Sequence, residues 1–298
     1  MSVGGEAWEA LPMVATAPEP HIADVLIAER APRLTAAPWW PLVRPALYRL
    51  LNYDRARRMA DAIGPMSGAE ALAFVSQLLA LKVEVRGLEH LPSSGRCVVI
   101  CNHPTGIADG VAVYDAIRPI RPDLIFYANA DALRVSPGLG GVLIPVEWVD
   151  GKRTREKTRL TLKATQAALE AERPLVVFPA GRIARRQPDG ALRDPVWQPT
   201  ALSLARKHAA TIVPVHVAGP WSTLFHLFNR FSPELRDITL FHELLNKTGR
   251  AFSLTFGPTI APEALGTDAG AMERLKGYIE AELPSGPDRS FAPGARTR

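Results

Sequence analysis

Short apolar runs alternate with longer stretches of helical periodicity along most of this chain. The runs are rich in valine, isoleucine and leucine, which is typical of buried strands. They fall at residues 83–85, 97–101, 124–128, 142–146, 175–178, 212–217 and 252–256. Helical spacing is found at residues 153–172, 201–208 and 269–283. This order predicts an α/β fold, with a mixed, mostly parallel sheet flanked by helices.

The first 82 residues have a different pattern. Residues 1–37 are rich in alanine and proline without a sustained period, which predicts a flexible arm with one helix near residues 22–30. Residues 38–82 form a predicted helical segment, with a second helix at 67–81, and Trp39, Trp40 and Leu42 alternate there with Arg44 and Arg49. Such a face suits the surface of a bilayer, or else packs on the main domain. That domain is predicted over residues 83–283, followed by a flexible tail at 284–298.

The composition is that of a globular protein. Of the 298 residues, 47% are hydrophobic and 22% are charged, which excludes a disordered or fibrous chain. No apolar stretch reaches the ~18 residues of a membrane-spanning helix. The nearest candidate, residues 209–228, is broken by Pro214, Gly219 and Pro220. The net charge of +5 suits anionic partners, and no nucleic-acid-reading motif accompanies it.

The cysteines indicate the compartment. Cys97 and Cys101 lie in one predicted strand, which holds them about 13 Å apart, too far to form a disulfide with each other. The N-terminal residues also lack the charged-then-apolar pattern of a secretion signal. Both observations predict a protein of the reducing cytoplasm.

A candidate catalytic pair follows the strand predicted at residues 97–101. The strand runs into Asn102, His103 and a turn containing Gly106, and Asp109 stands where a helix is predicted to begin. A carboxylate that accepts one ring proton of a histidine fixes the tautomer, so the other ring nitrogen can act as a general base near neutral pH. From spacing alone, a structural role for His103 in the turn is the commoner case.

A second strand end carries residues suited to anion binding. The run at residues 175–178 ends in Phe178, Pro179 and Gly181, and Arg182 and Arg185 follow. Glycine permits close approach of a ligand to the backbone, and the guanidinium fork matches carboxylate or phosphate. Taken alone, the arginines are typical of a solvated charge run, but two such strand ends at one edge of a sheet favour an active-site rim.

These blocks resemble, in order, those of the glycerolipid acyltransferases, the lysophosphatidic acid acyltransferase-like enzymes. The matching segments, all within residues 83–262, are Asn102-His103 with Asp109, then Phe178-Pro179-Ala180-Gly181, then Ile212-Val213-Pro214-Val215. Five residues separate the histidine from the aspartate, where the family usually has four. The longer spacing resembles a bacterial branch often called hemolysin-like.

Two departures from the family pattern concern acceptor binding. Ala180 stands where the family usually has a glutamate, and residues 141–146 lack the family's arginine. Both positions belong to the family's acceptor-binding apparatus, so they leave a lysophosphatidate acceptor in question. Candidates for a replacement charge are Arg182, Arg185 and the basic residues Lys152, Arg153 and Arg155.

The resemblance implies transfer of a fatty acyl group from acyl-CoA or acyl carrier protein to the hydroxyl of a lysophospholipid-type acceptor. His103 would remove the hydroxyl proton, Asp109 would orient the imidazole, and backbone N–H groups near Gly106 or Gly181 would stabilise the oxyanion. No metal or cofactor is expected. The expected partners are the acyl donor thioester, the lysolipid and the inner face of the cell membrane, and not nucleic acid. The predicted substrate contacts are Asn102, Gly106, Phe178, Pro179, Gly181, Arg182 and Arg185.

Three other functions fit the same residues. A phosphate-free lyso-aminolipid as acceptor would account for the missing glutamate and arginine. A protein that kept the fold without catalysis would bind lipid or tether membranes. Water in place of the acceptor would make the same base hydrolytic, although a Gly-x-Ser-x-Gly motif, the best mark of a serine hydrolase, is absent.

Overall fold

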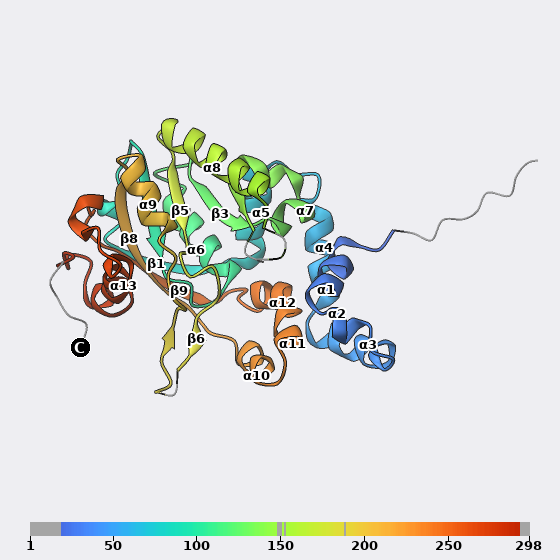
Figure 1. Cartoon of the computed structure of the whole chain (residues 1–298). Helices are drawn as coiled ribbons and strands as arrows, with labels where there is room; N and C mark the ends of the chain where they lie inside the picture. The colour runs from blue at the N-terminus through green and yellow to red at the C-terminus, as the bar shows by residue number, and fades with distance from the viewer. Residues whose placement is uncertain (1–18, 148–150, 152, 188, 293–298) are drawn as a thin grey trace, which may run out of the picture.

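A seven-stranded sheet forms the centre of the computed structural model, which describes residues 19–147, 151, 153–187 and 189–292 (Figure 1). The strand order is β1-β9-β8-β2-β5-β3-β4. These strands are β1 (Lys82–Arg86), β2 (Cys97–Cys101), β3 (Ile125–Asn129), β4 (Leu143–Val146), β5 (Pro174–Val177), β8 (Thr211–Ala218) and β9 (Ala251–Phe256). Each predicted strand is present and begins and ends within one residue of its prediction.

The sheet is mixed and mostly parallel, as predicted. β2 pairs parallel with β5 and β8, and β3 pairs parallel with β4 and β5. Only at one side does the direction change among the described strands, where β9 runs antiparallel to β8 and parallel to β1. Parallel neighbours require crossover connections, so helices lie on both faces of the sheet.

The central strand β2 is buried along its whole length, and its side chains divide between two cores. Cys97, Val99 and Cys101 belong to the core on one face, and Val98 and Ile100 belong to the core on the other. This division follows from the alternation of side chains along a strand. It explains why β2 reads as a continuous apolar run in the sequence.

Helices cover both faces. The first face is covered by α4 (Tyr53–Ile63), α5 (Gly68–Leu79), α6 (Ile107–Ile117) and α12 (Leu240–Leu245). The second is covered by α8 (Arg155–Glu170), α9 (Thr200–Lys207) and α13 (Ala271–Gly277). The helix predicted at residues 269–283 is α13 followed by a π-helical turn at Tyr278–Glu282 and a 3₁₀ turn at Leu283–Ser285.

Several short elements were not predicted, because each is shorter than the window in which a periodic pattern can be detected. Besides α12, they include α7 (Asp131–Val135), α10 (Thr223–Phe231), α11 (Pro233–Asp237) and the hairpin of β6 (Arg185–Arg186) and β7 (Leu192–Arg193). α10 and the hairpin lie beside the candidate site described below. Figure 1 places them with α3 along the lower edge of the molecule.

The N-terminal helices pack on the domain, which corrects the prediction of a flexible arm through residue 37. α1 (Ile22–Arg30), α2 (Pro32–Thr35) and α3 (Trp40–Leu50) follow one another, and α1 and α3 contribute Ala23, Ile27, Trp40 and Leu47 to a third apolar cluster. The hydroxyl of Tyr48 donates a hydrogen bond to Asp24 Oδ1 at 3.0 Å. Small alanines contribute part of the buried surface, so the sequence showed only a weak apolar period.

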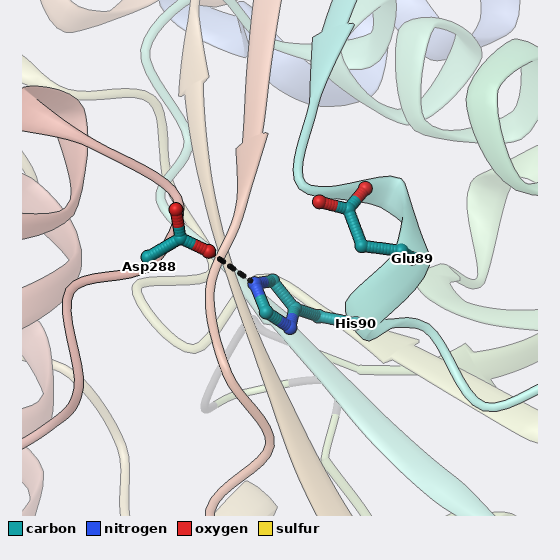
Figure 2. A group of neighbouring side chains, drawn as sticks. All are labelled: Glu89, His90 and Asp288. Carbon is teal, nitrogen blue, oxygen red and sulfur yellow. Dashed lines mark ion pairs between the residues drawn. The ribbon is translucent and has the colours of Figure 1, made fainter.

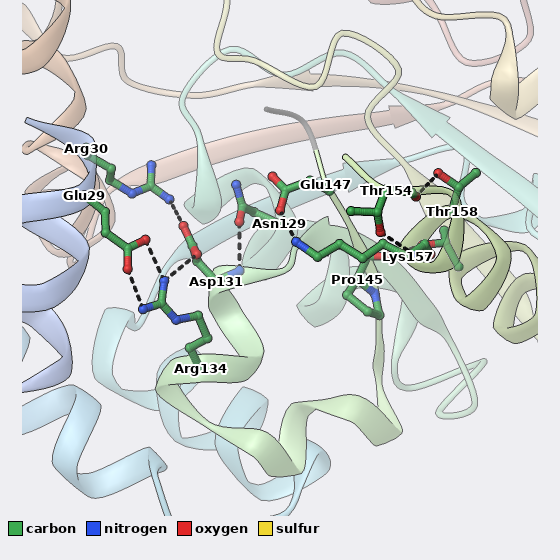
Figure 3. Close-up of polar contacts among 11 residues, drawn as sticks. Glu29, Arg30, Asn129, Asp131, Arg134, Pro145, Glu147, Thr154, Lys157 and Thr158 are labelled. Atoms are coloured by element: carbon green, nitrogen blue, oxygen red, sulfur yellow. Dashed lines mark hydrogen bonds and ion pairs between the residues drawn. The ribbon is translucent and has the colours of Figure 1, made fainter. Parts of the chain in front are cut away.

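Ion pairs also join α1 to α7. Arg30 Nη2 lies 2.6 Å from Asp131 Oδ2, and both terminal nitrogens of Arg134 bond to the Glu29 carboxylate at 2.8 and 2.9 Å (Figure 3). These partially exposed pairs contribute little stability individually. Together they nevertheless hold α1 against α7, the short helix that follows β3.

The C-terminal segment packs as well, which corrects the predicted flexible tail beginning at residue 284. Tyr278 and Phe291 meet edge to face with ring centroids 5.6 Å apart, and the Tyr278 hydroxyl donates to the carbonyl of Arg289. Residues 293–298 of the predicted tail, like residues 1–18 of the predicted arm, lie outside the described residues. None of the described helices combines the length and the apolar character needed to cross a bilayer.

Candidate active site

The candidate site lies at the edge of the sheet where β2 and β5 end. The register pairs Ile100 of β2 with Val177 of β5, so the loops that follow the two strands emerge side by side. The loop after β2 carries His103 and the loop after β5 begins with Phe178. Their rings are in contact, with centroids 4.5 Å apart. Parallel strands therefore bring together two sequence blocks that are far apart in the chain.

His103 and Asp109 form a hydrogen-bonded pair. His103 Nδ1 lies 2.9 Å from Asp109 Oδ2. The aspartate is fully buried, and it also accepts hydrogen bonds from the Thr105 N–H, the Thr105 hydroxyl and the Gly106 N–H at 2.9, 2.6 and 3.0 Å. With the carboxylate held on Nδ1, Nε2 is the ring nitrogen left for chemistry. No hydrogen bond joins Nε2 to another group in the described part of the chain.

Gly106 makes this geometry possible. It caps α6 with a φ of 100°, a backbone conformation that residues with a Cβ rarely adopt. A Cβ at this position would also lie 2.9 Å from Ile183 Cδ1. The turn can then bring the first residues of α6 back toward His103, so the role observed for Gly106 is to shape the site.

The main chain of His103 is held by the segment that follows β5. Its N–H donates to both carboxylate oxygens of Asp194, at 3.1 and 3.0 Å, and its carbonyl accepts from the Ala184 N–H at 2.9 Å. Asp194 is buried and also accepts a hydrogen bond from Trp197 Nε1 at 2.9 Å. Sequence reasoning missed Asp194, since no local pattern connects it with a histidine 91 positions away.

Asn102 lies beside the site but bonds within the fold. Its Nδ2 donates to the Val217 carbonyl at 2.9 Å, and its Oδ1 accepts from the Val217 N–H at 2.7 Å. The buried amide thus ties the end of β2 to β8. Contact of Asn102 with substrate stays a prediction.

The N–H groups of Gly106 and Gly181, in the region predicted to stabilise the oxyanion, already make hydrogen bonds within the protein. The Gly106 N–H donates to Asp109, and the Gly181 N–H donates to the Phe178 carbonyl at 3.0 Å. Neither points to a free acceptor position in this arrangement. An oxyanion site made of other backbone N–H groups near these two glycines stays a prediction.

A cavity of about 510 Å³ adjoins the turn at Pro179 and Gly181. Arg153, Lys157 and Arg182 give its wall a cationic character. Lys157 Nζ pairs with Glu147 Oε2 at 3.1 Å (Figure 3). His103 does not line this cavity, so the cavity lies next to the His103–Asp109 pair and does not contain it. Of the proposed replacement charges, Arg153 and Arg182 line this cavity and Lys152 lies outside the described residues.

Arg185 points in another direction, toward α10. Its guanidinium carbon lies 5.1 Å from the centre of the Phe225 ring. Burial, together with the nearby charge of Arg236, lowers the pKa of Arg185 to about 10, and its Nη1 is buried without a hydrogen-bond partner. A buried guanidinium nitrogen with no partner is suited to an anionic group of a ligand.

A buried ion pair is formed by Lys247 and Glu243. Lys247 Nζ lies 3.3 Å from Glu243 Oε2 and 2.8 Å from Asn246 Oδ1, and both charged side chains are almost fully buried. Burial lowers the pKa of Lys247, while Glu243 and, more weakly, Asp109 act in the opposite direction. Lys247, two residues beyond the end of α12, therefore places a cation near enough to Asp109 for the two charges to interact.

The residues described contain one group with metal-ligand atoms close together, namely Glu89, His90 and Asp288, within 4.8 Å of one another. Figure 2 shows His90 facing Asp288, with Nε2 and Oδ1 3.5 Å apart. The group follows β1, whose carboxyl end lies at the edge of the sheet opposite His103, and its carboxylates are exposed. It has no connection with the candidate active site.

Parts of this chain are similar to known proteins. The acyltransferase family model matches residues 82–218, which include both strand ends of the site. The lyso-glycine lipid O-acyltransferase of Phocaeicola vulgatus is 29% identical over 199 residues, 65% of this chain and 69% of that protein. The enzyme of the same name from Bacteroides thetaiotaomicron is 28% identical over 220 residues, 72% of this chain and 79% of its own.

A solved structure is also similar. The 1-acyl-sn-glycerophosphate acyltransferase PlsC of Thermotoga maritima aligns with a TM-score of 0.46 at 15% identity, covering 87% of this chain and 97% of that one.

The matched domain and the two relatives define the class of this protein as an acyltransferase. The matched segment contains the three sequence blocks that resemble those of the glycerolipid acyltransferases, and over residues 82–218 the chain is similar to the acyltransferase family.

Proposed function

We propose that this protein transfers a fatty acyl group from a thioester, acyl-CoA or acyl carrier protein, to the hydroxyl of a lyso-aminolipid. The observation that carries the proposal is the His103–Asp109 pair, 2.9 Å apart at the end of β2, with Nε2 of the imidazole free of protein partners in the described residues. Such a nitrogen can accept a proton from an alcohol.

In the proposed reaction, His103 Nε2 takes the hydroxyl proton of the acceptor while the oxygen attacks the thioester carbonyl. Asp109 holds Nδ1 and stabilises the positive charge that forms on the ring. The tetrahedral intermediate then collapses, the carbon–sulfur bond breaks, and the proton on Nε2 passes to the departing thiolate. The balance needs no further reactant.

The acceptor class rests on three observations. Ala180 replaces the family's usual glutamate, residues 141–146 lack its arginine, and two relatives act on lyso-glycine lipids. A headgroup that carries an amino-acid carboxylate would fit the cationic wall of the cavity, where Arg182 and Arg153 can supply charged hydrogen bonds.

The direct test is an acceptor panel. Purified protein is incubated with labelled acyl-CoA or acyl carrier protein and with a lyso-glycine lipid, lysophosphatidate or no acceptor, and the lipid extract is separated. We expect O-acylated product with the lyso-glycine lipid and much less with lysophosphatidate. Liposome binding without turnover of any donor would support the tethering function instead, and free fatty acid without acceptor would support hydrolysis.

Replacing Arg182 by alanine should weaken carboxylate-bearing acceptors selectively. A charged hydrogen bond contributes about 1.5–3 kcal/mol, so kcat/KM should fall about ten- to a hundredfold for the lyso-glycine lipid. The methyl ester of the same acceptor should be affected little. Lys163→Ala, an exposed cation on α8 outside the cavity, is the matched control. An unchanged ratio of acid to ester would exclude Arg182 from headgroup recognition.

We also propose that α3 and α10 hold the enzyme on the inner face of the membrane, where its acceptor resides. α3 exposes Trp39 at its N-cap, Leu42 and Leu50, and α10 exposes Leu227 and Phe231. Both helices pack inward on the same apolar cluster, and Figure 1 shows them along one edge of the molecule. Exposed arginines on each helix complement anionic lipid.

Glutamate at either Leu42 or Leu227 should reduce binding to vesicles of phosphatidylglycerol by about tenfold, because each change removes apolar contact and adds repulsion. The leucines are 82% and 47% exposed, so neither change disturbs the core. Leu160→Glu is the control, since Leu160 is 54% exposed and belongs to α8, a helix that Figure 1 shows away from α3 and α10. Co-sedimentation measures all three. Equal losses for all three variants would remove the assignment to α3 and α10.

A further inference from the structure

Asp194 occupies an unusual position for a carboxylate. It follows the β6–β7 hairpin, is 5% exposed, and receives the His103 N–H on both oxygens and Trp197 Nε1 on one. Its own N–H donates to Glu280 Oε1 at 2.8 Å. Because β2 ends at Cys101, the His103 N–H has no strand partner, and Asp194 supplies the missing acceptor.

Accepting a hydrogen bond from one backbone N–H with a buried carboxylate costs free energy, because the charge loses its hydration. Burial raises the pKa of Asp194 to about 7, and the neighbouring Glu280 adds to the effect. The hydrogen bonds from Trp197 and His103 oppose it. An amide or a carbonyl oxygen would accept the same bonds without placing a charge in the interior.

The charge lies next to the histidine that the proposed reaction makes cationic. Asp109 is hydrogen-bonded to Nδ1 of that ring, and Asp194 accepts a hydrogen bond from the main-chain N–H of His103. The other ionisable groups around Asp194 are Cys101 of β2, Glu280 of the π-helical turn with its partner Lys276, and Arg193 of the hairpin. Of all the ionisable groups around Asp194, only His103 gains a positive charge during the proposed reaction.

We propose that Asp194 is a positioning residue for His103, which fixes the main chain of the base and supplies a second negative charge that stabilises the imidazolium in the transition state. This inference rests on the proposed acyl transfer.

The charge gives the proposal a signature in pH. Above about pH 7 Asp194 is ionised and contributes, and below it the protonated group keeps the geometry without the charge. Asp194→Asn removes the charge and keeps an acceptor oxygen. The ratio of wild-type to Asp194→Asn kcat should therefore rise from near one at pH 5.5 to about ten at pH 8.5, with KM changed less than twofold.

Stability should show the opposite trend. The pKa of Asp194 is raised on folding from its ordinary value near 4, so the native state binds the proton more tightly and loses stability as pH rises from about 4 to 7. The free energy of unfolding of wild type, relative to Asp194→Asn, should decline over this range and level off above it. Asp189→Asn, an exposed carboxylate in the adjacent hairpin loop, should show neither trend.

Trp197→Phe tests the same idea without touching the carboxylate. Loss of the indole N–H removes a bond that lowers the pKa of Asp194, so the midpoint of the rise in rate should move to higher pH. If the ratio of wild-type to Asp194→Asn kcat does not depend on pH, and Trp197→Phe leaves the pH midpoint of the rate unchanged, the role of the Asp194 charge is overturned. The proposed acyl transfer would not be affected by that result. A wild type that transfers no acyl group at any pH would overturn the proposed function itself.

Discussion

Alanine at His103 should lower kcat for acyl transfer by about 10²- to 10⁴-fold, the usual contribution of a positioned general base. The acceptor hydroxyl would then have to lose its proton to water while it attacks the thioester. KM for the acceptor should change little, because the imidazole contributes to the transition state more than to binding. The measurement is steady-state release of the free thiol, together with separation of the lipid product.

His90→Ala is the matched control, because His90 lies at the opposite edge of the sheet and should leave the rate unchanged. Full activity in the His103 variant would remove the general-base assignment. A circular dichroism spectrum is recorded for each protein. If the His103 variant lacks the native spectrum, its lower rate reflects loss of folding and not loss of the general base. Activity that persists with His103→Gln would indicate that the residue only shapes the turn.

Methionine at Lys247 should destabilise the protein by about 3–5 kcal/mol, because it leaves the buried Glu243 carboxylate without its cation. Both side chains are almost fully buried, and their charged atoms lie 3.3 Å apart. The expected result is a lower midpoint of denaturant unfolding with an unchanged slope. Because α12 packs against α6, which carries Asp109, part of the loss should appear as reduced activity below the unfolding transition.

Removing both charges should recover much of that stability. Lys247→Met combined with Glu243→Leu replaces the ion pair by apolar groups of similar size, which is often neutral or stabilising. An exposed pair provides the comparison, since Arg193→Met removes the 2.8 Å contact with Asp189 and should cost less than about 1 kcal/mol. A Lys247→Met variant as stable as wild type would show that Glu243 is neutral in the native state.

The strands could be predicted closely because burial on both faces leaves a continuous apolar signal. β2 illustrates this, with every residue from Cys97 to Cys101 buried and its two faces in different cores. The same signal places His103 just beyond the end of a strand. The helix at residues 22–30 was predicted and is α1, but its packing on the domain was not, because small residues such as Ala23 supply part of its buried face.

The substrate contacts were harder to predict than the strands, because residue type and position along the chain do not determine where a side chain points. Arg182 and Arg185 are close in sequence, yet one lines the cavity and the other packs over the Phe225 ring. Asn102 precedes the base directly, yet its amide joins β2 to β8. The N–H groups of Gly106 and Gly181 lie in the region predicted to stabilise an oxyanion. In the structure they donate hydrogen bonds to Asp109 and to the Phe178 carbonyl instead.

The sequence by itself determined the parallel sheet and the pairing of His103 with Asp109, since both depend on local order: apolar runs make strands, and a short turn returns the aspartate to the histidine. Only the tertiary structure decided what surrounds that pair. Asp194 reaches the main chain of His103 from 91 positions away, and Lys247, just beyond the end of α12, brings a buried positive charge that interacts with Asp109. Charges interact through space and not along the chain, so contacts of this kind leave no local trace in the sequence.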